Sequence, residues 1–168
     1  MTTIQKKVCL LGDFAVGKTS LVRRFVKDRF DDKYLSTIGV KISRKTLERP
    51  TYTLNLLLWD LAGGDEYSNT ESGYLRGAAG ALIVCDLTRY ETIHALERYT
   101  KQLRLFNPQA AVVLVANKLD LTDERVIHDE ELHKVAHIIN GNGHYLLSSA
   151  KTGEGVNQAF EKLATLME

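Results

Sequence analysis

The residues best suited to do chemistry lie near the N-terminus, in the segment Gly12-Asp13-Phe14-Ala15-Val16-Gly17-Lys18-Thr19. Its spacing, G-x-x-x-x-G-K-[ST], is that of a loop whose backbone N–H groups surround the phosphates of a nucleotide. The Lys18 amine would reach the β- and γ-phosphates, and the Thr19 hydroxyl would coordinate Mg²⁺. The predicted nucleotide contacts in this segment are Asp13, Phe14, Ala15, Val16, Gly17, Lys18, Thr19 and Ser20.

The elements on either side of this loop are those that the motif requires. The apolar run Val8–Leu11 precedes it and predicts a buried strand. After it, Leu21, Val22, Phe25 and Val26 recur at the spacing of one face of a helix. The N-terminus of that helix would add partial positive charge where the phosphates bind.

Length and composition limit what the whole chain can be. Its 168 residues predict one domain, 1–168, large enough to bury a core. The net charge of +1 argues against bulk nucleic-acid binding and against a polybasic membrane patch. Cys9 and Cys85 each lie in an apolar run, so we expect buried, reduced thiols.

Signals for membrane attachment are missing from the sequence. No apolar run approaches the roughly 20 residues needed to span a bilayer. The N-terminus has no signal peptide and no myristoylation signal, and the last residues include no cysteine for prenylation. We therefore expect a cytoplasmic protein with no direct membrane anchor in this chain. Peripheral attachment through a partner or an absent tail stays open.

Apolar runs and amphipathic stretches alternate along the rest of the chain. Residues 40–47 and 51–59 predict a hairpin, and further strands are expected at 81–85, 112–116 and 145–147. Helices are expected at 93–106, at 129–140 with Asp129 as N-cap, and at 156–167. This alternation predicts a doubly wound α/β fold: a mostly parallel six-stranded sheet, one antiparallel edge strand, and helices on both faces.

Polar residues follow the ends of several predicted strands. Asp60-Leu61-Ala62-Gly63 follows the third, Asn117-Lys118-Leu119-Asp120 the fifth, and Ser148-Ser149-Ala150-Lys151 the sixth. Because ligands of such sheets bind beyond the carboxyl ends of the strands, these motifs should meet the phosphate loop at one edge. The additional predicted nucleotide contacts are Asn117, Lys118, Asp120, Ser149, Ala150 and Lys151.

The residue types of these motifs favour guanine over adenine. A carboxylate such as Asp120 can accept both the N1–H and the N2 amino hydrogens of guanine, whereas adenine has no donor at N1. The Lys118 stem can lie over the flat face of the base, and the Ala150 N–H is available to the guanine O6. Asp60, at the end of its strand, suits a water-mediated contact to Mg²⁺.

The order and spacing of these motifs resemble those of small GTPases of the Ras superfamily. The segment Ser36-Thr37-Ile38-Gly39-Val40 most resembles the Rab branch, and the resemblance covers essentially the whole chain. It implies a P-loop G domain that binds GTP and GDP with Mg²⁺ and hydrolyses GTP. It further implies that residues of about 30–40 and 61–76 switch between two states. Effectors, exchange factors and GTPase-activating proteins would read or change that state.

The resemblance also implies roles for individual residues. Thr37 corresponds to the threonine that binds Mg²⁺ and the γ-phosphate, and Gly63 to the glycine whose N–H bonds the γ-phosphate. Tyr34 corresponds to the tyrosine that closes over the phosphates, and Phe30 to the aromatic residue beside the base. Together with Lys18 and Gly64, Thr37 and Gly63 form the predicted catalytic set; Thr19, Thr37 and Asp60 form the predicted metal set.

Three apolar residues fall where Rab proteins carry a surface that effectors read: Ile42, Trp59 and Tyr74. The alternative for Ile42 and Trp59 is that they are ordinary core residues of the hairpin.

Two departures from the family pattern lie beside the reacting phosphate. Gly64 stands where the family carries its catalytic glutamine, and Phe14 stands where it carries a small residue. Glycine cannot orient a water, and a phenyl ring would crowd both that water and an inserted arginine. We therefore expect hydrolysis that is slow or depends on a partner. A GTP-locked binding module that serves as a scaffold or adaptor is the alternative. A P-loop kinase is less favoured, because N-K-x-D has no role in one.

Overall fold

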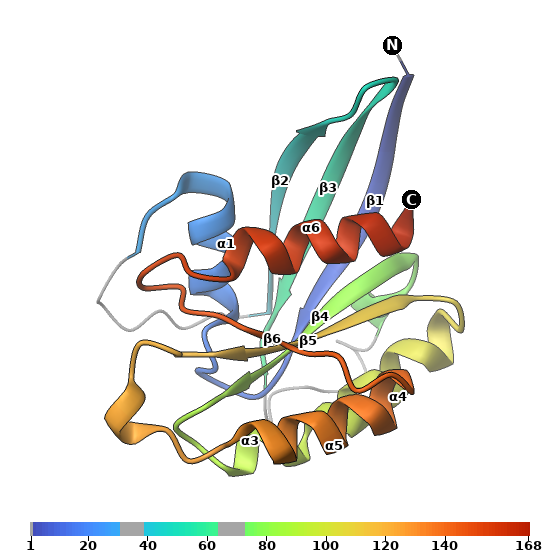
Figure 1. Cartoon of the computed structure of the whole chain (residues 1–168). Helices are drawn as coiled ribbons and strands as arrows, with labels where there is room; N and C mark the ends of the chain where they lie inside the picture. The colour runs from blue at the N-terminus through green and yellow to red at the C-terminus, as the bar shows by residue number, and fades with distance from the viewer. Residues whose placement is uncertain (1, 31–38, 64–72) are drawn as a thin grey trace.

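The structure is a computed structural model of the chain, and it describes residues 2–30, 39–63 and 73–168 (Figure 1). Six strands form one sheet in the order β2-β3-β1-β4-β5-β6. Their bounds are Thr2–Leu11 (β1), Val40–Glu48 (β2), Tyr52–Leu61 (β3), Ala78–Asp86 (β4), Ala111–Asn117 (β5) and Leu146–Leu147 (β6). Neighbouring strands are parallel except β2 and β3, which pair antiparallel at one edge. The predicted fold class is confirmed.

Helices cover both faces of the sheet (Figure 1). One face packs against α1 (Lys18–Lys27) and α6 (Val156–Met167), and the other against α3 (Glu91–His94), α4 (Leu96–Phe106) and α5 (Asp129–Asn140). Two short 3₁₀ helices, η2 (Gly73–Leu75) and η3 (Thr122–Glu124), lie in the connections.

The alternation of side chains along the strands produces two separate cores. Val8 and Leu10 of β1 point toward α1 and α6, whereas Cys9 and Leu11 point toward α4 and α5. In the first of these cores the rings of Phe25 and Phe160 stack, with centroids 4.1 Å apart, and so join α1 to α6. Burial raises the pKa of the Cys9 thiol to about 12, which agrees with a reduced, unreactive cysteine.

Three local predictions differ from the structure. Strand β1 begins at Thr2 instead of near Val8, because its polar first half pairs with β3 from Tyr52 onward. The helix predicted over 93–106 is divided at Ala95 into α3 and α4. The N-cap of α5 is His128, not Asp129, because the Glu131 carboxylate accepts the His128 N–H at 3.0 Å.

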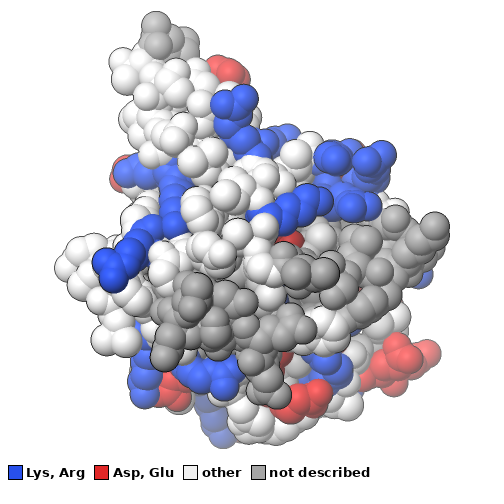
Figure 2. All heavy atoms as spheres, turned by 180° about the vertical axis from the view of Figure 1, so that it is seen from behind, with Lys and Arg blue, Asp and Glu red and all other residues white. Residues whose placement is uncertain are grey.

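The surface shows an uneven distribution of charge. On the face seen in Figure 2, basic side chains dominate the upper half and the larger acidic patches lie in the lower half. None of the helices in the described part of the chain is long and apolar enough to cross a membrane.

Candidate functional site

The phosphate loop, residues 12–19, joins β1 to α1 in a backbone conformation that depends on glycine. Gly17 has φ of +105°, and a Cβ there would lie 2.2 Å from Asn117 Nδ2. Gly12 has φ of +151°, and a Cβ there would lie 2.4 Å from the Val84 carbonyl oxygen. The loop therefore packs directly against the ends of β4 and β5, and a side chain at either position would separate them.

Lys18 places a buried cation inside this loop. Its side chain is 6% exposed, and its Nζ donates to the carbonyl oxygens of Gly12 at 2.6 Å and Asp13 at 3.1 Å. Burial lowers the pKa of Lys18 to about 8, although the nearby carboxylates of Asp60 and Asp13 oppose this shift. Because no carboxylate of the described residues forms an ion pair with Lys18, an anion held by the loop would stabilise the charged amine.

Two of the three predicted metal ligands meet beside the loop. Asp60 is the buried, second-to-last residue of β3, and the Thr19 hydroxyl donates to its Oδ2 at 2.5 Å. A hydroxyl and a carboxylate oxygen are the hard ligands that Mg²⁺ binds in nucleotide sites, so this pair fits that ion. The third predicted ligand, Thr37, lies outside the described residues.

Gly63 lies against the phosphate loop from the other side. A Cβ at this position would lie 2.3 Å from the Gly12 carbonyl oxygen and 2.7 Å from Lys18 Nζ. The structure thus brings together the predicted catalytic residues Lys18 and Gly63. Gly64 and Tyr34, like Thr37, lie outside the described residues.

Asn117 joins the phosphate loop to the loops after β5 and β6. Its side chain is buried; Nδ2 donates to the Val16 carbonyl at 3.0 Å. Its Oδ1 accepts from the Ser148 hydroxyl at 3.0 Å and from the Ala150 N–H at 3.2 Å. The Ala150 N–H, predicted to be available to a guanine O6, is thus bonded to Asn117 and would have to share this bond with a ligand.

One oxygen of the Asp120 carboxylate accepts a hydrogen bond, and among the described residues the other oxygen has no donor. The Ser149 hydroxyl donates to Asp120 Oδ1 at 2.7 Å, and no described residue donates to Oδ2. Lys118 has φ of +73°, and its Nζ pairs with Asp86 Oδ2 at 2.8 Å. This left-handed backbone is uncommon for lysine and is held by the surrounding contacts.

Asp86 is a site residue that the sequence analysis missed. It ends β4, is fully buried, and pairs with Arg89 as well as with Lys118. Its Oδ1 accepts from the Thr88 N–H at 2.8 Å and from the Thr88 hydroxyl at 2.6 Å. Asp86 directly follows the apolar run 81–85, and a polar residue at the end of a predicted strand is the sequence signal for it.

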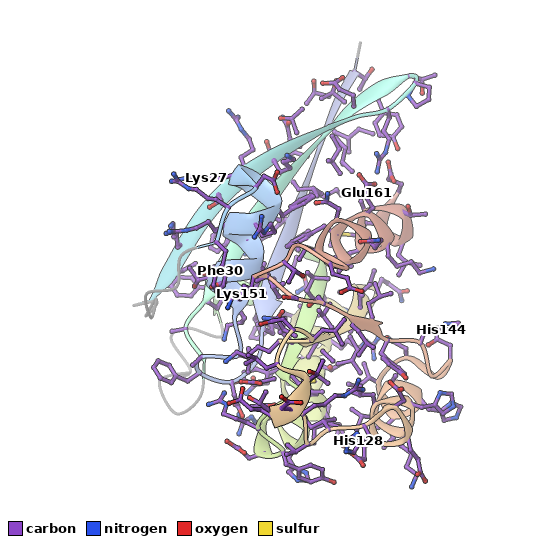
Figure 3. The ribbon with its side chains drawn as sticks, turned by 60° about the vertical axis from the view of Figure 1, so that its left-hand side comes forward. Lys27, Phe30, His128, His144, Lys151 and Glu161 are labelled. Atoms are coloured by element: carbon purple, nitrogen blue, oxygen red, sulfur yellow. The ribbon has the colours of Figure 1, made fainter. Side chains whose placement is uncertain are left out.

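Arg24 is a second residue that was missed. From the middle of α1 it donates through Nε to the Ala150 carbonyl at 2.9 Å and through Nη2 to the Lys151 carbonyl at 2.5 Å. Figure 3 shows Phe30 and Lys151 near the same end of α1, well away from His128 and His144. Phe30 is half-buried and packs against the core formed by α1 and α6.

Asp13 and Phe14 of the phosphate loop contact residues on the face of the sheet that packs against α4. Asp13 Oδ1 accepts from the buried Tyr99 hydroxyl at 3.2 Å and lies 3.7 Å from Arg98 Nη2. Arg89 Nη2 donates to the Phe14 carbonyl at 2.5 Å, and the Phe14 side chain is 43% exposed. The phenyl ring therefore stands at the surface of the loop.

The three candidate effector residues lie close together. The rings of Trp59 and Tyr74 are 6.1 Å apart, and Ile42 is paired with Trp59 across β2 and β3. Trp59 and Tyr74 are half-buried against the core, whereas Ile42 is 51% exposed. Lys7 Nζ stands 3.7 Å above the Trp59 ring. An effector-reading role for these residues stays a prediction.

Comparison with known proteins identifies the family. Residues 7–168 match the family model described as Ras family. The chain belongs to the Ras family. It is 37% identical over 165 residues to the mouse protein "Ras-related protein Rab-22A", covering 98% of this chain and 84% of that protein. It is 40% identical over 166 residues to "GTP-binding protein ypt5" of Schizosaccharomyces pombe, covering 98% and 78%. Human "Ras-related protein Rab-3A" is 33% identical over 162 residues, covering 96% and 73%.

These relatives place the chain in the Rab branch of the Ras family. It is a Rab-like GTP-binding switch, of a family whose members bind GTP and GDP, generally with Mg²⁺, and hydrolyse GTP. Regulators and effectors are partners of the family in general.

Proposed function

We propose that this Ras-family chain holds GTP or GDP along the carboxyl edge of its sheet and hydrolyses GTP slowly or with help from a partner. One observation carries the proposal. The buried Lys18 amine and the Thr19–Asp60 pair lie at one end of the edge, and the Asn117–Asp120–Ser149 set lies at the other. Asn117 joins the two ends through Val16 and Ala150.

The base end suits guanine. Asp120 Oδ2 is available to accept a hydrogen bond, while Ser149 fixes the carboxylate through Oδ1. An adenine N1 would place an acceptor against this carboxylate, so ATP should bind more weakly. Lys118, held at its tip by Asp86, would lay its stem along the base.

The phosphate end is built to hold negative charge. Lys18 and the loop N–H groups would bind the β- and γ-phosphates, and Gly63 would donate its N–H to the γ-phosphate. Bound Mg²⁺ would neutralise charge on the phosphate oxygens. Thr19, Asp60 and Thr37 would hold that ion.

The rate of hydrolysis should be low. Gly64 offers no side chain to orient the attacking water, and the exposed Phe14 ring stands at the surface of the loop. Turnover in the family is slow even with a glutamine, about 10⁻⁴ to 10⁻³ s⁻¹ in the Ras case. The same two residues favour a second candidate function, a GTP-locked binding module that serves as a scaffold or adaptor.

Nucleotide competition tests the base end. We expect GTP to displace bound GDP at concentrations at which ATP does not, and Asp120→Ala to lose this discrimination. Calorimetric titration of both nucleotides into wild type and Asp120→Ala measures it. Equal affinity of wild type for GTP and ATP would show the proposal to be wrong.

Single-turnover hydrolysis tests the phosphate end. Gly64→Gln should hydrolyse GTP faster than wild type, because it restores a side chain that can orient water. Gly73→Gln is the matched control, since a Cβ at Gly73 would meet nothing within 4 Å and Gly73 is not among the predicted catalytic residues. A wild type faster than Gly64→Gln contradicts the explanation. Negligible turnover by wild type would favour the GTP-locked module.

A further inference from the structure

The turn between β4 and α3 presents Arg89 to the phosphate loop. The Arg89 N–H donates to the Asp86 carbonyl at 3.0 Å. The Arg89 carbonyl accepts from the Thr92 N–H at 3.1 Å and from the Thr92 hydroxyl at 2.8 Å. Thr92 is fully buried. The backbone of Arg89 is therefore fixed on both sides, so its side chain always starts from the same place.

The guanidinium of Arg89 joins two groups that lie far apart in the sequence. Its Nε pairs with Asp86 Oδ2 at 3.2 Å, and its Nη2 donates to the Phe14 carbonyl at 2.5 Å. Because the guanidinium is planar, the anchored Nε determines the direction in which Nη2 points. Arg89 therefore connects the end of β4 to the phosphate loop.

The hydrogen bond from Arg89 sets the orientation of the peptide group between Phe14 and Ala15. In a trans peptide group the C=O and the N–H point in opposite directions. A Phe14 carbonyl that points toward Arg89 therefore leaves the Ala15 N–H pointing away from it. Ala15 is a predicted nucleotide contact, and its N–H is the group that a phosphate oxygen would bind.

The backbone conformation of Ala15 is costly for the residue type. Ala15 has φ of +62°, in the left-handed region that glycine adopts freely and that alanine adopts at a cost. Such a conformation persists only where the surrounding contacts hold it in place. The hydrogen bond from Arg89 to the neighbouring carbonyl is a contact of that kind.

The same arrangement occurs two residues further along the phosphate loop. The Val16 carbonyl accepts from Asn117 Nδ2 at 3.0 Å, and the residue that follows it, Gly17, has φ of +105°. In both places a side chain from the carboxyl edge of the sheet holds a carbonyl, and the next residue is left-handed. Backbone of this kind directs successive N–H groups into a concave site for an anion.

Two other roles for Arg89 have to be separated from this one. The simpler role is to neutralise the buried carboxylate of Asp86, although Lys118 already pairs with that carboxylate at 2.8 Å. The other is to act through charge alone. Burial is the main cause of the lowered pKa of Lys18, nearby carboxylates oppose the shift, and the Arg89 guanidinium adds to it. Neither role requires Nη2 to reach a carbonyl of the phosphate loop.

We propose that Arg89 is a positioning residue: by holding the Phe14 carbonyl, it keeps the Ala15 N–H directed at a phosphate of the bound nucleotide. Asp86 anchors it for this purpose. The inference rests on the proposed function, because it requires a guanine nucleotide in the phosphate loop. It gives the turn between β4 and α3 a part in phosphate binding that a glycine in place of Ala15 would make unnecessary.

The test measures dissociation of a fluorescent GDP analogue from wild type, Arg89→Ala, Ala15→Gly and the double variant. Arg89→Ala should release the analogue about three- to tenfold faster than wild type, as expected for one lost hydrogen bond. In the Ala15→Gly background the left-handed conformation has no penalty, so the same removal should change release by less than about twofold. Equal effects of Arg89→Ala in the two backgrounds would overturn the proposal.

Arg125→Ala is the matched control. Arg125 also joins a carbonyl to a carboxylate, because it donates to the Ile127 carbonyl at 2.8 Å and pairs with Asp129 at 3.2 Å. Neither partner belongs to the phosphate loop, so its removal should leave release within about twofold of wild type. Equal acceleration by Arg125→Ala and Arg89→Ala would indicate general destabilisation and contradict the proposal.

Nucleotide preference separates the proposal from a role at the base. The preference of Arg89→Ala for GTP over ATP should stay within about twofold of the wild-type preference, because the proposed contact serves a phosphate. Competition between the two nucleotides measures it. A loss of preference would place the effect at the base, through the pair of Asp86 with Lys118, and would overturn the proposal.

Arg89→Lys separates the proposal from a role of charge alone. Lysine keeps the charge but lacks the planar fork that reaches the Asp86 carboxylate and the Phe14 carbonyl together. Arg89→Lys should therefore still release the GDP analogue at least about twofold faster than wild type. Release at the wild-type rate would assign the effect to charge and refute the positioning role.

GDP binding by wild type keeps this inference apart from the proposed function. If wild type binds GDP and Arg89→Ala releases it at the wild-type rate, only the inference fails. If wild type binds no guanine nucleotide, the proposed function fails and the inference fails with it. Circular dichroism checks the fold of each variant; should Arg89→Ala unfold, Arg89→Lys provides the comparison in both backgrounds.

Discussion

At the scale of single residues, the candidate site depends on glycines whose backbone lies so close to other groups that no Cβ would fit between them. Gly17 lies against Asn117 Nδ2, and Gly63 lies against Lys18 Nζ and the Gly12 carbonyl. Each glycine thus permits a contact that holds a predicted nucleotide-binding residue in place. These contacts explain why glycine occupies the positions next to Asn117 and Lys18.

Gly63→Ala is expected to weaken GDP binding and lower the free energy of unfolding by about 1–3 kcal/mol. The added methyl must displace the Gly12 carbonyl or the Lys18 amine, which would lie at 2.3 and 2.7 Å. Chemical denaturation and a nucleotide titration measure the two effects. Gly73→Ala is the matched control, because a Cβ there meets nothing within 4 Å. Equal behaviour of the two variants would contradict the argument.

At the scale of elements, α1 connects the two ends of the site. It begins in the phosphate loop at Lys18, and Arg24, two turns along, donates to the Ala150 and Lys151 carbonyls after β6. Phe25 on the same helix stacks on Phe160 of α6. The helix therefore fixes the distance between the loop that would hold phosphate and the loop that would hold the base.

Arg24→Lys should speed GDP release between about twofold and tenfold, the range that one lost hydrogen bond of about 0.5–1.5 kcal/mol allows. Lysine keeps the charge but lacks the planar fork that reaches two carbonyls. Dissociation of a fluorescent GDP analogue gives the rate. Arg104→Lys is the control, since Arg104 donates to the Ile139 carbonyl at 2.6 Å, away from the site. Release at the wild-type rate from Arg24→Lys would refute this role.

At the scale of the whole molecule, contacts between distant parts of the chain secure the end of the sheet opposite the candidate site. Arg49, in the turn between β2 and β3, pairs with Glu161 at 3.0 Å and with Glu168 at 2.9 Å, and Tyr52 also donates to Glu168. The hydrogen bond from Arg49 lowers the pKa of Glu168, although partial burial opposes the shift. The hairpin is thereby fastened to α6.

Arg49→Ala should cost about 1 kcal/mol or less at neutral pH, because the pairs are partly exposed and screened by water. The folded-state pKa of Glu168 is lowered, so its contribution is present above the unfolded value near 4.5 and is lost as pH falls through the folded value. The difference between wild type and variant should therefore shrink on acidification. Denaturation at pH 7 and pH 3 measures it.

Arg44→Ala, on the same hairpin, provides the comparison. Arg44 is exposed and has no ion pair among the described residues, so its removal should change stability by less than about 0.5 kcal/mol. A difference between wild type and Arg49→Ala that grows at low pH would show that the ion pairs do not contribute as argued.

The sequence by itself determined the fold class and the edge of the sheet at which the site lies. Hydrophobic runs predict strands because a parallel strand is buried on both faces, and the motifs after those strands must then meet at one edge. The predictions of a phosphate loop and of a preference for guanine follow from residue type and spacing alone. The exposed first half of β1 is polar and lacks the continuous apolar run that indicates a buried strand, so the sequence does not predict it.

Only the tertiary structure decided which residues hold the site together. Asn117 bonds to Val16, 101 residues away, and Arg24 to Ala150, 126 residues away. Most partners in these bonds are backbone groups, which every residue carries, so no spacing in the sequence could indicate them. Asp86 likewise pairs with Lys118 only because β4 and β5 lie side by side. Residue types therefore indicate the chemistry of the site, whereas the hydrogen bonds that hold the site together depend on which backbone atoms the fold brings close.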